Sequence, residues 1–235
     1  MKTPGIAFPV VNIVIVTLFT ACSVLEKSSQ HGFENGYYKF KSNNLLAGKV
    51  YVQMDDKEVE VYKSEQNILE NLPYHINLAD TDSISGPMKF TRKSLDIDLT
   101  TILLKYRPSV NDRPAQMITD FNIALYAGWR HDTYILNKEL DPLKKPKTSI
   151  KAKGYDFGVF CGPGTTVINS FSTGNKTESE YNGMILQYGL AGFLESNMAS
   201  FGIAVGYDFL MNPDRKIWIY TRKPWVGLII GIALN

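Results

Sequence analysis

Six stretches between residue 94 and the C-terminus alternate, residue by residue, between an apolar side and a small or polar side. The clearest is the run Ser200 to Met211. Its two faces are Phe201, Ile203, Val205, Tyr207 and Phe209 on one side, and Ser200, Gly202, Ala204, Gly206 and Asp208 on the other. Successive side chains of a strand point to opposite faces, so this run predicts a strand with one apolar stripe. A small second face suits a narrow, crowded lumen better than a surface in water, and we therefore expect the apolar stripe to face outward.

The other five runs repeat this design. Their apolar faces are Leu95, Ile97, Leu99 and Leu103; Phe121, Ile123, Leu125, Ala127 and Trp129; Tyr155, Phe157, Val159 and Cys161; Met184, Leu186, Tyr188 and Leu190; and Val226, Leu228, Ile230, Ile232 and Leu234. Each run has the roughly 9 to 11 residues that a tilted strand needs to cross a bilayer. Length and alternation together are typical of the wall of a transmembrane β-barrel.

The predicted fold is an all-β, antiparallel, up-and-down transmembrane β-barrel over residues 86–235. Single-chain bacterial barrels have at least eight strands, so we expect eight, with two more from residues 37–90 or from Lys216 to Thr221. Residues 37–85 hold short, partly charged alternating pieces around a turn at Asp55-Asp56. These predict a small β-hairpin region on the periplasmic side.

The N-terminus is typical of an exported protein. Lys2 precedes an apolar stretch from Ile6 to Ala21, which predicts a signal peptide over residues 1–21. The small residues before Cys22 resemble a bacterial lipobox, in which that cysteine becomes the acylated first residue; ordinary cleavage and a retained anchor are the alternatives. Residues 22–36 are polar and aperiodic, as in a tether.

Composition excludes several classes of function. The net charge of the 235 residues is +2, and no basic stripe interleaved with aromatic residues indicates nucleic-acid binding. The lysines from Lys144 to Lys153 lie in a connector and are interpreted as a solvated turn. Cys161 belongs to an outward apolar face, and the three histidines lack metal-ligand spacing, so we expect no metal or other cofactor. No catalytic motif is present, and we expect no enzyme activity.

Connector lengths predict an orientation, because bacterial barrels have short periplasmic turns and longer outer loops. The tight connection from Glu195 to Met198 is expected in the periplasm. The connectors 107–116, 169–180 and 212–224 then lie outside, and the long connector 137–149 is one exception on the periplasmic side. The loop 169–180, rich in Ser, Thr, Asn and Gly, is the candidate for contacting an extracellular or envelope protein partner.

Charged side chains recur on the inward faces. This predicted lumen cluster contains Asp96, Asp98, Asp120, Arg130, Asp132, Asp156, Glu195 and Asp208. Buried charges are costly unless they are paired or hydrated. The cluster is interpreted either as a hydrogen-bonded plug, which we favour, or as a cation or polar-solute site.

Several segments together resemble a group of uncharacterised bacterial outer-membrane β-barrel proteins. They are Asp96-Ile97-Asp98-Leu99, Lys105-Tyr106-Arg107-Pro108, Ala124 to Arg130, Gly206-Tyr207-Asp208, Arg215 to Tyr220, Lys223 to Gly227 and Gly231 to Asn235. The resemblance covers about residues 90–235 and implies a fold and an outer-membrane location, without an activity or a catalytic residue.

We therefore expect a small outer-membrane lipoprotein with a structural or recognition role in the cell envelope, in contact with membrane lipid. Two alternatives stay open. One is a narrow, porin-like pore for cations or polar solutes. The other is a lipid-tethered periplasmic barrel whose apolar faces turn inward to bind an apolar ligand.

Overall fold

Strands make up 73% of the structure, a computed structural model that describes residues 32–42, 47–55, 58–65, 68–69, 74–78, 86–140, 142–195 and 200–233. The chain divides into two compact units, residues 1–33 and residues 34–235. The second unit contains every strand described here. The expected leader, Cys22 and most of the expected tether lie outside the described residues. Within the described ranges, no helix has the length and apolar character needed to cross a membrane.

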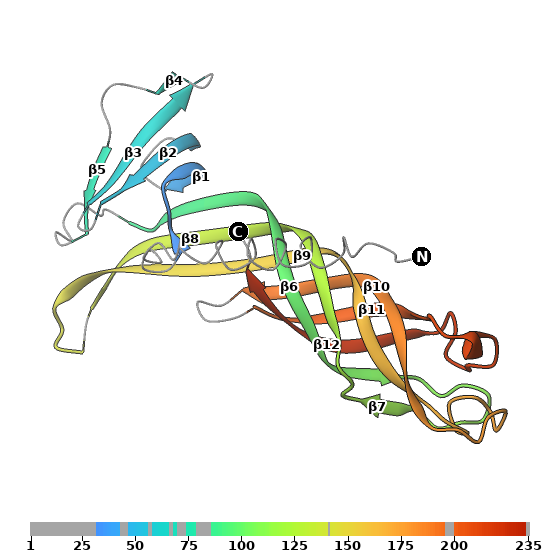
Figure 1. Cartoon of the computed structure of the whole chain (residues 1–235). Helices are drawn as coiled ribbons and strands as arrows, with labels where there is room; N and C mark the ends of the chain where they lie inside the picture. The colour runs from blue at the N-terminus through green and yellow to red at the C-terminus, as the bar shows by residue number, and fades with distance from the viewer. Residues whose placement is uncertain are drawn as a thin grey trace, which may run out of the picture. The chain divides into compact units, whose positions relative to one another are not determined.

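Figure 1 shows the order of these elements along the chain. They are β1 (Gly36–Ser42), β2 (Gly48–Met54), β3 (Glu58–Glu65), β4 (Ile68–Leu69), β5 (Tyr74–Asn77), β6 (Met88–Arg107), β7 (Gln116–Ile118), β8 (Ile123–Leu140), β9 (Pro146–Ile168), β10 (Tyr181–Glu195), β11 (Ser200–Leu210), the 3-10 turn η4 (Pro213–Lys216) and β12 (Pro224–Ala233).

Six strands close into a ring. Their order is β6-β8-β9-β10-β11-β12, and β12 pairs back onto β6, from Val226 opposite Tyr106 to Ala233 opposite Asp98. All neighbours in the ring are antiparallel. The prediction of an all-β antiparallel fold is therefore confirmed.

The outer face of the ring is apolar, as the alternation predicts. On β11, Phe201, Ile203 and Val205 are 57%, 60% and 46% exposed, whereas Ala204 is fully buried. The same alternation of exposed apolar and buried small or polar side chains continues on the other ring strands. Exposed examples are Leu95, Ile97, Leu99, Leu103, Leu125, Trp129, Tyr155, Phe157, Val159, Met184, Leu186, Tyr188, Leu190, Val226, Leu228 and Ile232.

The ring has six strands in the described residues, and the predicted eight are not confirmed. Of the two candidate sources of further strands, residues 216–221 form the end of η4 and turns. The other source, residues 37–90, forms strands that pair outside the ring, because β1 pairs with β6 only along Met88–Thr91, away from the part of β6 that β12 covers. The alternation in these short strands is real, but a period of two does not say which sheet a strand joins.

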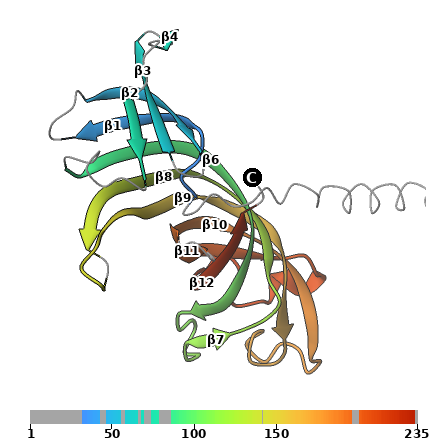
Figure 2. The same ribbon diagram turned by 90° about the vertical axis from the view of Figure 1, so that its left-hand side faces the viewer.

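Beyond the ring, β6, β8 and β9 continue into another part of the same sheet, which we call the extension. Its order is β9-β8-β6-β1-β2-β3, with β5 on the far edge of β3 (Figure 2). One face of the extension buries a continuous apolar core. The core consists of Tyr38, Phe40, Val50, Val52, Val59, Val61, Ile76, Met88, Phe90, Tyr134 and Leu136. The rings of Tyr38 and Tyr134, on two strands that flank β6, meet edge to face at 5.9 Å.

The connector 137–149 is not a long loop. Its residues extend the hairpin of β8 and β9, with Asn137 opposite Ser149 and Leu140 opposite Pro146. Only the turn between Leu140 and Pro146 separates the two strands. The prediction of a long connector at residues 137–149 is therefore wrong, because these charged, Pro-containing residues continue the two paired strands.

A β-bulge in β6 reverses the alternation at one point. The pairing with β12 shifts between Leu228 and Ile229, so that Leu104 and Ile102 are consecutive partners and Leu103 is skipped. A bulge adds one residue to one strand and changes which face the following side chains take. Lys105 and Arg107 therefore face inward and are buried, although simple alternation from Leu95 to Leu103 places them outside.

Small residues on the inner face are required by the tight closure of the ring. A ring of fewer strands has a smaller radius, and even eight strands leave an interior that side chains fill. A Cβ atom on Gly206 would lie 2.7 Å from the Trp225 ring and 2.9 Å from that of Phe160. At Gly158 it would lie 2.2 Å from the Ala127 carbonyl oxygen. The glycines thus make room for aromatic side chains inside a strongly curved sheet.

Candidate functional site

The interior of the ring is the most elaborate polar site of the described chain. We call the end with connectors 108–115, 169–180 and 211–223 the loop end, and the opposite end, where the β10–β11 connection lies, the turn end. Between the two ends the inward side chains form three layers. An ion-paired layer lies near the loop end, an aromatic layer follows, and an acidic layer lies towards the turn end.

The ion-paired layer is centred on Asp208 of β11. Its carboxylate accepts hydrogen bonds from Lys105 Nζ at 3.0 Å, Arg107 Nη2 at 2.6 Å and Trp225 Nε1 at 2.9 Å. Arg107 also donates to Thr166 Oγ1 at 3.1 Å. The Lys105 and Asp208 side chains are 0% and 1% exposed, so these charges rely on each other rather than on water.

Aromatic rings complete the surroundings of the two cations. The Lys105 ammonium lies 4.6 Å from the centre of the Trp225 ring, and the Arg107 guanidinium lies 5.1 Å from Trp218 and 4.9 Å from Tyr220. Contacts of this kind stabilise a cation most where water is excluded. Trp218 and Tyr220 belong to the connector after η4 and pack into an apolar cluster with Ile168, Ile185 and Leu210. The loop end is thereby closed from within by its own connector.

The aromatic layer fills the middle of the ring. Tyr126 meets Phe193 edge to face at 4.9 Å, and Phe160 meets Trp225 at 5.8 Å. All four side chains are at most 2% exposed. They form one buried cluster together with Ile102, Ala124, Ala191, Ala204 and Ile229.

The acidic layer contains Asp96, Asp98 and Asp156, all at most 4% exposed. The Tyr126 hydroxyl donates to Asp156 Oδ1 at 2.6 Å, and the charges of Asp98 and Asp156 both act on Asp96. Adjacent buried carboxyl groups cannot all carry full charge without compensation. The charge of Arg130 acts on Asp96, and its Nε donates to Asp132 Oδ1 at 3.0 Å.

The residues of the predicted lumen cluster therefore do not form one site but lie in separate parts of the ring. Asp96, Asp98 and Asp156 meet in one layer, Arg130 and Asp132 form a pair beside it, and Asp208 stands apart in the ion-paired layer. Asp120 is half-buried, just before β8, and its charge acts on Lys105. The side chain of Glu195 lies outside the described residues. Alternation predicts that these side chains share the inner face of the ring. It does not predict their height along the ring axis, because the stagger between neighbouring strands depends on how they pair.

Two central residues of this site, Lys105 and Arg107, escape prediction from alternation. The sequence carries one signal of the bulge that turns them inward, since Ile102-Leu103-Leu104 is a run of three apolar residues inside an alternating strand. Such a run cannot keep the period of two. The run marks the point after which odd-numbered residues of β6 face inward instead of outward.

The loop 169–180 is partly built into the cap of the ring. Ser172 and Thr173 are buried; the Thr173 hydroxyl donates to the Asn169 carbonyl at 2.8 Å, and the Ser172 carbonyl accepts from the Ile219 amide at 3.0 Å. Residues 174–176 and 178–180 are exposed. The surface that this loop offers to a partner is thus limited to its second half.

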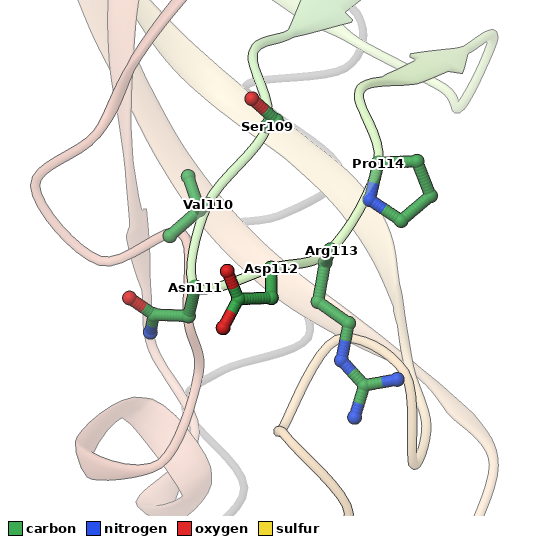
Figure 3. A pocket seen from close by; sticks show the side chains of 6 residues that line it. All are labelled: Ser109, Val110, Asn111, Asp112, Arg113 and Pro114. Atoms are coloured by element: carbon green, nitrogen blue, oxygen red, sulfur yellow. The ribbon is translucent and has the colours of Figure 1, made fainter.

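The connector between β6 and β7 forms a second exposed feature at the loop end. Val110 and Arg113 pair around a tight turn in which Asn111 and Asp112 have φ of 48° and 60°, a conformation that these two residue types tolerate well. Residues 109–114 line a shallow depression of about 440 Å³ (Figure 3). The depression is formed by one loop alone, and the Arg113 guanidinium leans towards the ring of Phe171 at 5.3 Å, which ties the turn to the loop 169–180.

No three His, Cys, Asp or Glu side chains are arranged to hold a metal ion in the part of the chain that the structure describes. Comparisons with known protein families, curated proteins and solved structures gave no match. The resemblance to outer-membrane barrel proteins stays a prediction, and function is inferred from the geometry of the chain itself.

Proposed function

We propose that this chain is a small outer-membrane β-barrel lipoprotein with a structural or recognition role in the cell envelope. In this proposal the six-stranded ring crosses the bilayer and the loop end faces the outside. The extension lies in the periplasm, and an acyl group on Cys22 adds a second attachment to the membrane.

One observation carries the proposal: large apolar side chains are exposed on every strand of the ring, while the charged side chains are inside. A soluble protein rarely exposes apolar patches of more than a few hundred Å². An apolar outer band around a polar or filled interior is the arrangement that hydrocarbon favours, and a closed ring leaves no unpaired strand edge in the lipid.

The height of the band agrees with a bilayer. The outward side chains run from Phe201 on β11 to Met211 directly after it, within the span of about 9 to 11 residues that a tilted strand needs. Exposed aromatic residues lie near both ends of the band, with Tyr106 and Phe209 towards the loop end and Trp129 and Tyr155 towards the turn end. Aromatic side chains favour the two membrane interfaces.

A structural or recognition role fits the interior better than a pore does. The aromatic layer and the ion-paired layer occupy the ring, and their side chains are nearly inaccessible to water. No observation favours conduction over a plug. The second alternative, an apolar ligand held inside, requires apolar faces turned inward, and the interior contains an acidic layer and an ion-paired layer.

Cell fractionation combined with gel mobility tests the location. We expect the native protein in the outer-membrane fraction, released by detergent but not by high salt, and migrating faster before boiling than after. A Cys22→Ser variant that still fractionates with the outer membrane separates the contribution of the ring from that of the lipid. Recovery of this variant in the soluble periplasmic fraction would contradict the proposal.

Planar-bilayer recording tests the pore. We expect no steady conductance from the wild-type protein. A cation-selective current that changes in an Asp156→Asn variant would favour the pore and contradict the plug.

A further inference from the structure

Seven lysines of β1, β6 and β9 lie on the outer face of the extension, the face opposite its apolar core, and Lys49 of β2 is a further lysine on that face. This group, which we call the lysine collar, consists of Lys39, Lys41, Lys89, Lys93, Lys147, Lys151 and Lys153. All seven are exposed, whereas the alternate residues of β1, β6 and β8, such as Phe40, Phe90 and Tyr134, are buried. The lysines from 147 to 153 are part of the basic run that the sequence alone suggests is a solvated turn, and they instead line β9.

Charge is concentrated here at a cost to stability. Lys41 is the direct cross-strand partner of Lys89, and Lys39 is that of Lys49. Like charges directly opposite each other destabilise a sheet. On the outer face of the described parts of β1, β6, β8 and β9 within the extension, the one acid is Glu139, which forms an ion pair with Lys151. The positive charge on these strands therefore exceeds that of the one carboxylate on their described outer face, and the next acids on that face, Glu58 and Glu60, lie on β3, beyond β2.

The collar continues directly into the apolar band of the ring. Lys93, His131 and Tyr155 are neighbours in one row of three paired strands. The next outward row towards the ring is Leu95, Trp129 and Phe157. Two residues along a strand span only about 7 Å, so the lysines begin within one side-chain length of the last apolar row.

We propose that the lysine collar binds the headgroups of anionic phospholipids in the leaflet at the turn end of the ring. This inference rests on the proposed function, because it takes the apolar band as the part of the ring in hydrocarbon. Next to that band, a lysine can lay its methylene stem along apolar surface and place its ammonium among lipid phosphates. An anionic cell-wall polymer would also bind a basic surface, but it would not require lysines such as Lys93 and Lys153 to lie next to the apolar band.

Lipid selectivity of the reconstituted full-length protein tests the collar. The protein is placed in phosphatidylcholine vesicles with and without phosphatidylglycerol, and the lipids in its boundary shell are measured with spin-labelled analogues of both. We expect a preference for phosphatidylglycerol that falls with salt. Loss of one contacting lysine lowers relative affinity by about fivefold, so the triple variant Lys89→Gln, Lys93→Gln and Lys153→Gln loses most of the preference.

Two further variants make the result specific. The control is the triple variant Lys176→Gln, Lys216→Gln and Lys223→Gln, which removes the same charge from exposed positions at the loop end. We expect it to keep the preference for phosphatidylglycerol. Arginine at the three collar positions also keeps it. Gel mobility in phosphatidylcholine alone reports membrane insertion separately. The inference is overturned if the inserted protein shows no lipid preference, or if the collar and control variants lose the preference equally. In either case the proposed function stands.

Failure to insert in either lipid mixture overturns the proposed function and the collar with it. Co-sedimentation with purified cell-wall sacculi that is lost in the collar variant, with lipid preference unchanged, would assign the lysines to the cell wall and also overturn the inference.

Discussion

Replacing Asp208 with asparagine tests whether the interior of the ring is dry. The carboxylate is the shared partner of Lys105 at 3.0 Å and Arg107 at 2.6 Å, and all three side chains are at most 4% exposed. Removing one partner of a buried ion pair costs about 3–5 kcal/mol, because the other charge stays buried without compensation. We expect Asp208→Asn to lower the free energy of unfolding by about that amount.

Alanine at the same position removes a further interaction. Asparagine keeps a side-chain oxygen that can accept the hydrogen bond from Trp225 Nε1, now 2.9 Å from Asp208 Oδ1. Alanine leaves this buried donor without a partner, at a further cost of about 1–3 kcal/mol. The order of stability is therefore wild type, Asp208→Asn and Asp208→Ala. Adding Lys105→Met to Asp208→Asn should recover part of the loss, because one uncompensated charge is removed.

Urea unfolding of the protein in lipid vesicles, followed by gel mobility and tryptophan fluorescence, measures these differences. The control is Asp112→Asn, an exposed acid at the tip of the turn between β6 and β7, where we expect a change within about 0.5 kcal/mol. A loss below about 1 kcal/mol for Asp208→Asn would refute the reasoning. It would mean that water reaches the Lys105 and Arg107 side chains, and the interior would then be hydrated rather than closed.

Three other changes test the wall, the packing and the orientation. Val205→Arg places a charge in the middle of the outward stripe of β11 and should cost about 2–4 kcal/mol in a bilayer; equal stability in lipid vesicles would argue that this face is in water. Gly206→Ala puts a Cβ 2.7 Å from the Trp225 ring and should cost about 1–3 kcal/mol, whereas Gly48→Ala, with open space around it, should cost much less in the same urea titration. A cysteine at the exposed position Lys176 should react with a membrane-impermeant maleimide in intact cells; labelling only after lysis would reverse the orientation.

The ring strands β8 to β12 were predictable because one physical signal dominates them. Each strand separates large apolar residues from Gly, Ala and acids over many positions, so the face of each side chain follows from a period of two. The exposure of Phe201 and the burial of Ala204 agree with that prediction. Antiparallel pairing between chain neighbours follows from the short connections.

Other features depend on relations between strands, which no single strand encodes. The bulge at Leu103 is set by pairing with β12, and it moves Lys105 and Arg107 to the inner face. The grouping of the inward acids into separate levels is set by the stagger of the ring. Strands of the extension, such as β1, share the period of two with the ring strands, but the period alone does not show that their apolar side is the buried one.

The composition of the loop 169–180 does not predict how much of the loop is buried. Its polar residues indicate a solvated loop, but Ser172 and Thr173 use their hydroxyl groups inside the cap. Short polar side chains satisfy backbone groups in tight connections as readily as they meet water. Composition therefore does not distinguish a loop that binds a partner from one that covers the end of its own sheet.

The seam between β12 and β6 has a consequence for biogenesis. It joins the last described strand of the chain to the first strand of the ring, so the middle of β6 has no second neighbour until β12 has been made and has paired with it. Until then, the row of amide and carbonyl groups from Asp98 to Tyr106 is an open template for pairing with another chain. A nascent or truncated polypeptide that ends before β12 should therefore aggregate or depend on a chaperone, and the ten residues of β12 protect this edge of β6.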